Sequence, residues 1–231
     1  MRIFTPLLLS CLLTLSGGAA ALADSLPATL TVTGTSVIAA VPDLATLQIG
    51  VTTNGTTAAE AMAANSKALA VVIARLQAAK IAPRDYQTSS LSLNPNWVNN
   101  AAGTASEIQG YTASNMLTVR VRAIDQVGTV LDAVISNGAN ALNSLSFGLQ
   151  NPRPVEDEAR KQAVADAVAR ATLIATAAGS KLGPVLSITE GGATGPMPGP
   201  EYSKFADAAV PVAQGEVEVS AAITMVFTLD E

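Results

Sequence analysis

Residues 111–122 read YTASNMLTVRVR, and the alternation that ends this stretch is the clearest structural signal in the chain. Leu117, Val119 and Val121 are apolar, whereas the residues between them are threonine and arginine. Successive side chains of a strand point to opposite faces, so apolar residues at every second position indicate one buried face. The stretch therefore predicts a half-buried strand whose threonine and arginine side chains point outward.

Helical patterns lie on both sides of this strand. A capping box, Thr57 with Glu60, opens a helix expected over 57–79. A shorter helix is expected over 125–137, where apolar residues recur at helical spacing before a glycine stop. The longest, over 154–179, begins at a proline, ends at a glycine and carries alanines every four residues. Such a ridge of small side chains lets a helix lie close to a sheet.

The remaining alternating stretches are expected to be strands. They cover residues 29–41, 44–51, 86–93, 141–149, 185–188 and 217–229. The resulting order is ββα, ββα, βα, ββ, which predicts an α+β fold with helices packed on largely antiparallel sheet. The two successive ββα units suggest an internal duplication, although no strong residue-level repeat accompanies them.

Two stretches are expected to be long, mobile loops. Residues 94–109 are rich in Asn, Ala and Gly, and residues 191–215 are rich in Gly and Pro. Large side chains in such loops can anchor a partner, or they can pack back onto their own domain. The candidate partner contacts are Trp97, Met197, Tyr202 and Phe205.

Residues 1–23 have the pattern of a secretory signal. Arg2 supplies a positive charge, residues 7–15 are apolar, and the Ala-Leu-Ala at 21–23 is a small-x-small cleavage site. The apolar segment is shorter than the roughly 20 residues that a membrane-spanning helix needs. Cleavage is therefore expected to leave residues 24–231 as one exported domain without a transmembrane segment.

The chain contains no histidine, and its one cysteine, Cys11, lies in the leader. Histidine is the usual general base near neutral pH, and thiolates are the usual soft nucleophiles and metal ligands. Without them the exported chain has no Ser-His-Asp or Cys-His site and none of the common zinc sites. The sequence therefore favours a protein that is not an enzyme and needs no cofactor or metal. A lipidated Cys11, at the end of a lipobox-like LLSC stretch, is the alternative fate of the leader.

The acidic residues suggest no catalytic pair. Asp43, Asp85 and Asp125 lie at expected turns or helix starts, where turn and cap chemistry accounts for them. The acidic run at 156–158 suits the positive start of the longest helix, and three consecutive residues do not share one helix face to hold a cation. A cofactor-free enzyme using Ser, Lys or carboxylates stays open as an alternative. A net charge of −5 provides no basic surface for nucleic acid.

Motifs in every part of the chain resemble one family. They are Val32-Thr33-Gly34 with Pro42-Asp43 and Ala45; Asp85-Tyr86-Gln87-Thr88; Gly110-Tyr111 with Ser114-Asn115; Val127-Gly128 with Val130-Leu131-Asp132; Gly138-Ala139-Asn140 and Phe147; and Ala159-Arg160-Lys161, Ala163-Val164 and Asp166-Ala167 with Ala178-Gly179 and Lys181-Leu182-Gly183. In this order, over roughly residues 29–229, they resemble the SIMPL domain family of bacterial proteins. The sequence departs from the family mainly in the two long loops.

The resemblance implies an α+β domain in periplasmic or outer-membrane-associated proteins. It also implies links to immunogenicity, oxidative-stress protection and large ring-like oligomers, and it carries no catalytic residues. Together with the residues, it predicts a periplasmic homo-oligomer that supports envelope or oxidative-stress fitness, with an envelope protein as a further potential partner. The alternative is a periplasmic module that binds a small ligand or client protein through the two long loops. Because the exported chain has no thiol, any stress protection would be indirect.

Overall fold

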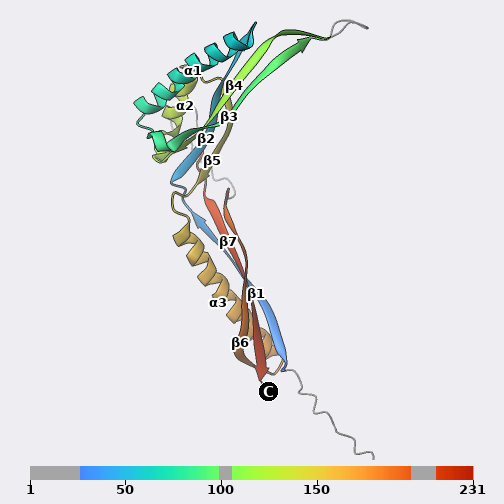
Figure 1. Cartoon of the computed structure of the whole chain (residues 1–231). Helices are drawn as coiled ribbons and strands as arrows, with labels where there is room; N and C mark the ends of the chain where they lie inside the picture. The colour runs from blue at the N-terminus through green and yellow to red at the C-terminus, as the bar shows by residue number, and fades with distance from the viewer. Residues whose placement is uncertain (1–26, 99–105, 199–211, 231) are drawn as a thin grey trace, which may run out of the picture.

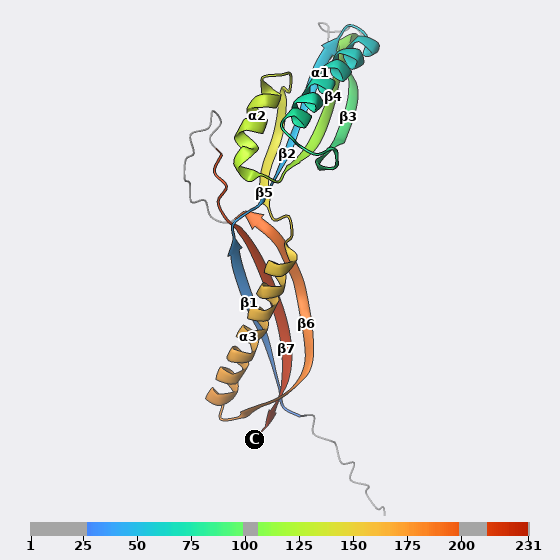
Figure 2. The same ribbon diagram turned by 90° about the vertical axis from the view of Figure 1, so that its left-hand side faces the viewer.

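The structure is a computed structural model, and it describes residues 27–98, 106–198 and 212–230. Two antiparallel sheets and three α-helices form an elongated molecule with two lobes, one above the other in Figure 1. All three helices lie on the same side of the sheets, which faces the viewer in Figure 2. The expected leader and its cleavage site lie outside the described residues.

The first lobe is a four-stranded sheet with two helices on one face. Across the sheet its strands are β3 (Tyr86–Val98), β4 (Glu107–Val121), β2 (Leu44–Gly55) and β5 (Ala141–Gly148). The helices are α1 (Ala58–Ala78) and α2 (Val127–Ile135), with the short 3₁₀ helices η1 (Pro83–Asp85) and η2 (Ile124–Gln126) before β3 and α2. Leu117, Val119 and Val121 are buried beneath the helices, so the predicted inward face of this strand is confirmed.

The second lobe is a three-stranded sheet under one long helix. Its strands are, in order, β1 (Thr29–Ala40), β7 (Val217–Asp230) and β6 (Lys181–Pro198), and its helix is α3 (Arg153–Ala177). Alternate β7 residues from Val219 to Phe227 are buried against α3. The two lobes thus have separate hydrophobic cores, each between a sheet and its helices.

The α+β class and the order ββα, ββα, βα, ββ are confirmed. The two ββα units nevertheless pair differently. β3 and β4 pair with each other, whereas β1 pairs with β7 and β2 pairs with β4 and β5, so β1 and β2 lie in different sheets. The suggested duplication therefore has no counterpart in the strand pairing.

The alanine ridge of α3 explains how closely this helix lies on its sheet. Its buried residues are Ala159, Ala163, Ala167, Ala171 and Ala175. Opposite them on β1 stands Gly34, where a Cβ atom would come within 2.1 Å of the Ala163 carbonyl oxygen. Small residues on both elements therefore let the two backbones approach each other.

The predicted boundaries of the loops at 94–109 and 191–215 are wrong, because the neighbouring strands extend into both. β3 continues to Val98, β4 begins at Glu107, and β6 continues to Pro198. The first part of β3 agrees with the strand expected over 86–93, but every residue from Asn94 to Val98 is exposed, so no buried face marks this extension as a strand. Its backbone is held by pairing with β4 instead, because ladder hydrogen bonds do not depend on side-chain type.

The capping box expected at the start of α1 is confirmed. The Thr57 side chain accepts a hydrogen bond from the Glu60 N–H at 3.2 Å, and a Glu60 carboxylate oxygen accepts one from the Thr57 N–H at 3.3 Å. We expect Thr57→Ala to lower the free energy of unfolding by about 1 kcal/mol, because an amide of the first turn loses its partner. Urea denaturation measures the loss. Ser66→Ala, at an exposed position within α1, is the control and should cost nothing.

Candidate functional site

The two candidate partner contacts that the structure describes, Trp97 and Met197, lie in different sheets. Trp97 lies on β3 opposite Ile108, and its side chain is 59% exposed. Met197 lies on β6 opposite Glu218 in the other sheet and is 57% exposed. Both stand on paired strands, which corrects their expected place in loops. Tyr202 and Phe205 lie outside the described residues.

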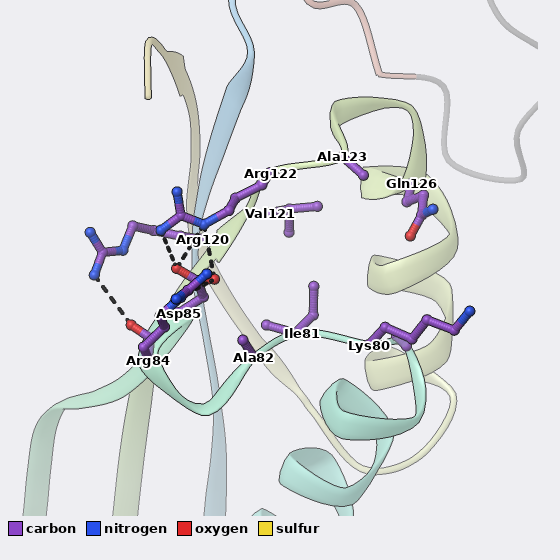
Figure 3. A pocket seen from close by; sticks show the side chains of 11 residues that line it. Lys80, Ile81, Ala82, Arg84, Asp85, Arg120, Val121, Arg122, Ala123 and Gln126 are labelled. Atoms are coloured by element: carbon purple, nitrogen blue, oxygen red, sulfur yellow. Dashed lines mark hydrogen bonds and ion pairs between the residues drawn. The ribbon is translucent and has the colours of Figure 1, made fainter. Parts of the chain in front are cut away.

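A hollow of about 330 Å³ opens where α1 turns toward β3, beside the start of α2 (Figure 3). We call it the arginine hollow and define it by its polar lining, which is Lys80, Arg84, Asp85, Arg120, Arg122 and Gln126. Apolar side chains, among them Ile81 and Val121, form the rest of its wall. A second hollow of about 260 Å³ adjoins it and shares Arg84, Asp85 and Arg120.

The end of α1 sets the first side of this hollow. The helix closes with a Schellman turn: the Lys80 N–H donates to the Gln77 carbonyl at 2.9 Å, and the Ile81 N–H donates to the Leu76 carbonyl at 3.0 Å. Lys80 has a φ of 62°, in the left-handed region that glycine usually occupies at such a turn. The chain then enters η1, which ends at Asp85.

Asp85 forms an ion pair with Arg122 of the β4–η2 connection. The Arg122 Nη2 and Nε groups donate to the two carboxylate oxygens at 2.7 and 3.0 Å. Asp85 is only 5% exposed, whereas the Arg122 side chain is 42% exposed. The hydrogen bonds from Arg122 lower the pKa of Asp85, and the charges of Arg122, Arg84 and Arg120 add to this against the opposing effect of burial. The carboxylate is therefore ionised and structural at neutral pH.

A chain of hydrogen bonds continues from Arg122 to the junction of the two lobes. Arg122 Nη1 donates to the Gln150 side-chain oxygen at 3.1 Å, and the Gln150 N–H donates to an Asp43 carboxylate oxygen at 2.6 Å. Asp43 lies between β1 and β2, and Gln150 lies between β5 and α3, so both stand where the chain crosses from one lobe to the other. The network therefore connects the arginine hollow to the inter-lobe junction.

Turn and cap chemistry does not account for the three aspartates, since the Asp43 carboxylate accepts its bond from distant Gln150. Asp85 is a buried ion-pair partner, which sequence reasoning missed because its arginine lies 37 residues further along the chain. Asp125 is exposed, and no side chain caps η2 or α2. The sequence feature that could have indicated this site is the pair of outward arginines, Arg120 and Arg122, at the end of the alternating stretch 111–122.

The acidic run at the start of α3 is paired with basic side chains. Arg160 lies 2.9 Å from the Asp157 carboxylate and 2.7 Å from that of Glu190 on β6, and Lys161 lies 3.7 Å from that of Glu158. Over residues 27–98, 106–198 and 212–230, no group of three potential ligands could hold a metal ion. In the same part of the chain, no helix combines the length and apolar character required to cross a membrane.

Comparisons with known proteins show the family of this chain. The model of the SIMPL family, described as a protein of unknown function (DUF541), matches residues 30–227. The 26 kDa periplasmic immunogenic protein of Brucella melitensis is 38% identical over 216 residues, which are 88% of this chain and 85% of that protein. The uncharacterized protein YggE of Escherichia coli is 33% identical over 187 residues, which are 80% of this chain and 75% of that protein. Because the family model and both relatives cover most of its length, the chain belongs to the SIMPL family.

Proposed function

We propose that this SIMPL protein is exported to the periplasm, has no catalytic activity and self-associates to support envelope or oxidative-stress fitness. Its similarity to a protein named for the periplasm supports the location. The leader pattern supports export, and the absence of histidine and of any cysteine beyond Cys11 supports a protein without catalytic activity. The observation that carries self-association is the outer part of the β3–β4 pair.

We call this part the arm and define it as residues 91–98 of β3 and 107–112 of β4. Figure 1 shows it extending away from the body of the lobe, beyond the cover of the helices. Its exposed apolar side chains are Leu91, Leu93, Trp97, Val98 and Ile108. β3 is also an edge of its sheet, so its outer backbone groups are open to another strand. Exposed apolar side chains beside an open edge favour docking onto a second copy.

The wild-type protein is therefore expected to be larger than a monomer at micromolar concentration. Size-exclusion chromatography with light scattering measures its mass. Trp97→Ser with Ile108→Ser should shift the population toward monomer, because this pair forms the apolar end of the arm. Leu173→Ser, on the exposed side of α3, is the control and should leave the mass unchanged. A strictly monomeric wild type would contradict self-association.

The second candidate function is a periplasmic module that binds a small ligand or client protein. The arginine hollow is the observation that favours it, and it lies away from β6 and its Met197. Replacing residues 199–211 with a short Gly-Ser linker tests binding through this segment, since β6 and β7 remain whole. Loss of ligand binding in this variant would place the ligand at that loop, whereas unchanged binding would favour the hollow.

A further inference from the structure

We propose that the arginine hollow binds a phosphate group, either free or carried by a larger molecule. The proposal gives the second candidate function a place and a ligand class, and it does not depend on self-association. Its chemistry follows from the charge of the lining, the geometry of the arginines and the backbone of Lys80.

The hollow concentrates positive charge in an acidic protein. Four of the 13 Lys and Arg residues of the chain line it, with Asp85 as the one carboxylate among its lining residues. Figure 3 shows Arg84, Arg120 and Arg122 close to that carboxylate, with Lys80 and Gln126 on the other side of the hollow. Like charges repel one another, so this arrangement carries a surplus that a bound anion would neutralise.

Two of the arginines are available for a ligand. Arg122 is engaged by Asp85 and Gln150, but the closest approach of Arg84 to the Asp85 carboxylate is 3.9 Å. The Arg120 Nη2 group donates to the Arg84 carbonyl oxygen at 3.3 Å. A guanidinium presents paired N–H groups in a plane, a geometry that matches two oxygens of a phosphate. Arg84 and Arg120 are therefore the expected ligand-binding residues.

The start of α2 adds to the positive potential. Its N-cap is Gln126, a lining residue, and no side chain caps this nine-residue helix. The beginning of a helix carries a partial positive charge that favours anions. The side of the hollow at Gln126 therefore also favours a negatively charged ligand.

Lys80 adopts a backbone conformation that has a cost for a residue with a side chain. α2 and α3 are followed by Gly138 and Gly179, both with positive φ, whereas α1 is followed by Lys80. A residue with a Cβ atom is strained in the left-handed region, and glycine is not. At this glycine position Lys80 adds a positive charge to the lining of the hollow.

Isothermal titration calorimetry with inorganic phosphate tests the site on the purified wild-type protein. Arg84→Gln with Arg120→Gln should weaken phosphate binding at least tenfold. Lys67→Gln with Lys161→Gln is the matched control, because it removes the same charge from exposed positions outside the hollow. That control should change the affinity less than twofold. Equal weakening in both double variants, or no binding to the wild type in either format below, would overturn the proposal.

A third variant separates the site from general loss of folding. Lys80→Gly should raise the melting temperature by roughly 2–4 °C, because it relieves the left-handed backbone, and should weaken phosphate binding severalfold. Tighter or unchanged binding would remove Lys80 from the site and contradict the proposal.

Vesicles distinguish the two sources of phosphate. Sedimentation with phosphatidylglycerol vesicles, but not with phosphatidylcholine vesicles, in a manner that needs Arg84 and Arg120 would assign a lipid headgroup. Calorimetric binding without sedimentation would assign a free phosphate compound. Binding in neither format overturns the proposal, whereas a different ligand found elsewhere would leave the second candidate function intact.

Discussion

Gly34→Ala is expected to lower the free energy of unfolding of the α3 lobe by about 3 kcal/mol or more. The added methyl would lie 2.1 Å from the Ala163 carbonyl oxygen and 2.3 Å from the Ala167 amide nitrogen. Both are backbone atoms, so no rotation of a side chain relieves the overlap. Either α3 moves away from β1 or the strand distorts, and both responses open the core that the alanine ridge closes.

Because the two lobes have separate hydrophobic cores, the loss of stability can be measured in the α3 lobe alone. Because α3 packs on β1, β7 and β6, the variant should lose part of its helical circular dichroism at a lower urea concentration than the wild type. Trp97 lies in the other lobe, and its fluorescence should still report a folded sheet there. Gly148→Ala is the matched control, since no atom lies within 4 Å of the added Cβ. Equal stability of the Gly34 and Gly148 variants would contradict the close approach.

The elements that the sequence predicts correctly depend on short-range chemistry. The inward face of residues 117–121 follows from alternation, the start of α1 from the Thr57 capping box, and the tight packing of α3 from its alanine spacing. Each signal lies within one element. Each is therefore visible before any tertiary contact is known.

The features that the sequence does not predict depend on long-range contacts or lack a buried face. The pairing of β1 with β7 joins residues at opposite ends of the chain, and nothing in either strand specifies it. Residues 94–98 and 107–109 of the arm are all exposed, so no buried face distinguishes them from a loop. The arginine hollow requires the end of α1 and the end of β4 to meet, and this depends on the register of the sheet. The prediction that Arg120 and Arg122 point outward is correct, but it does not identify Asp85 as their neighbour.

Asp85→Asn is expected to lower the free energy of unfolding by about 2 kcal/mol at pH 7. The substitution removes the charge that Arg122 binds through both Nε and Nη2, and it leaves three arginines near one another without their carboxylate. The loss is smaller than for a fully buried pair because the Arg122 side chain is partly exposed and regains water. Asp157→Asn, in an exposed pair with Arg160, is the control and should cost less than about 1 kcal/mol.

The pH dependence of this difference identifies its electrostatic origin. Hydrogen bonds from Arg122 place the pKa of folded Asp85 below its ordinary value of 3.8, so the unfolded chain binds this proton more readily than the folded chain. The stabilisation by Asp85 is therefore complete well above pH 3.8 and is lost as the pH falls from there through the lowered pKa. Urea denaturation should accordingly show a constant gap between wild type and Asp85→Asn from pH 7 to about 5, which closes toward pH 2. A gap that persists unchanged into acid would mean that Asp85 stabilises the end of η1 by packing, because a steric contribution does not titrate.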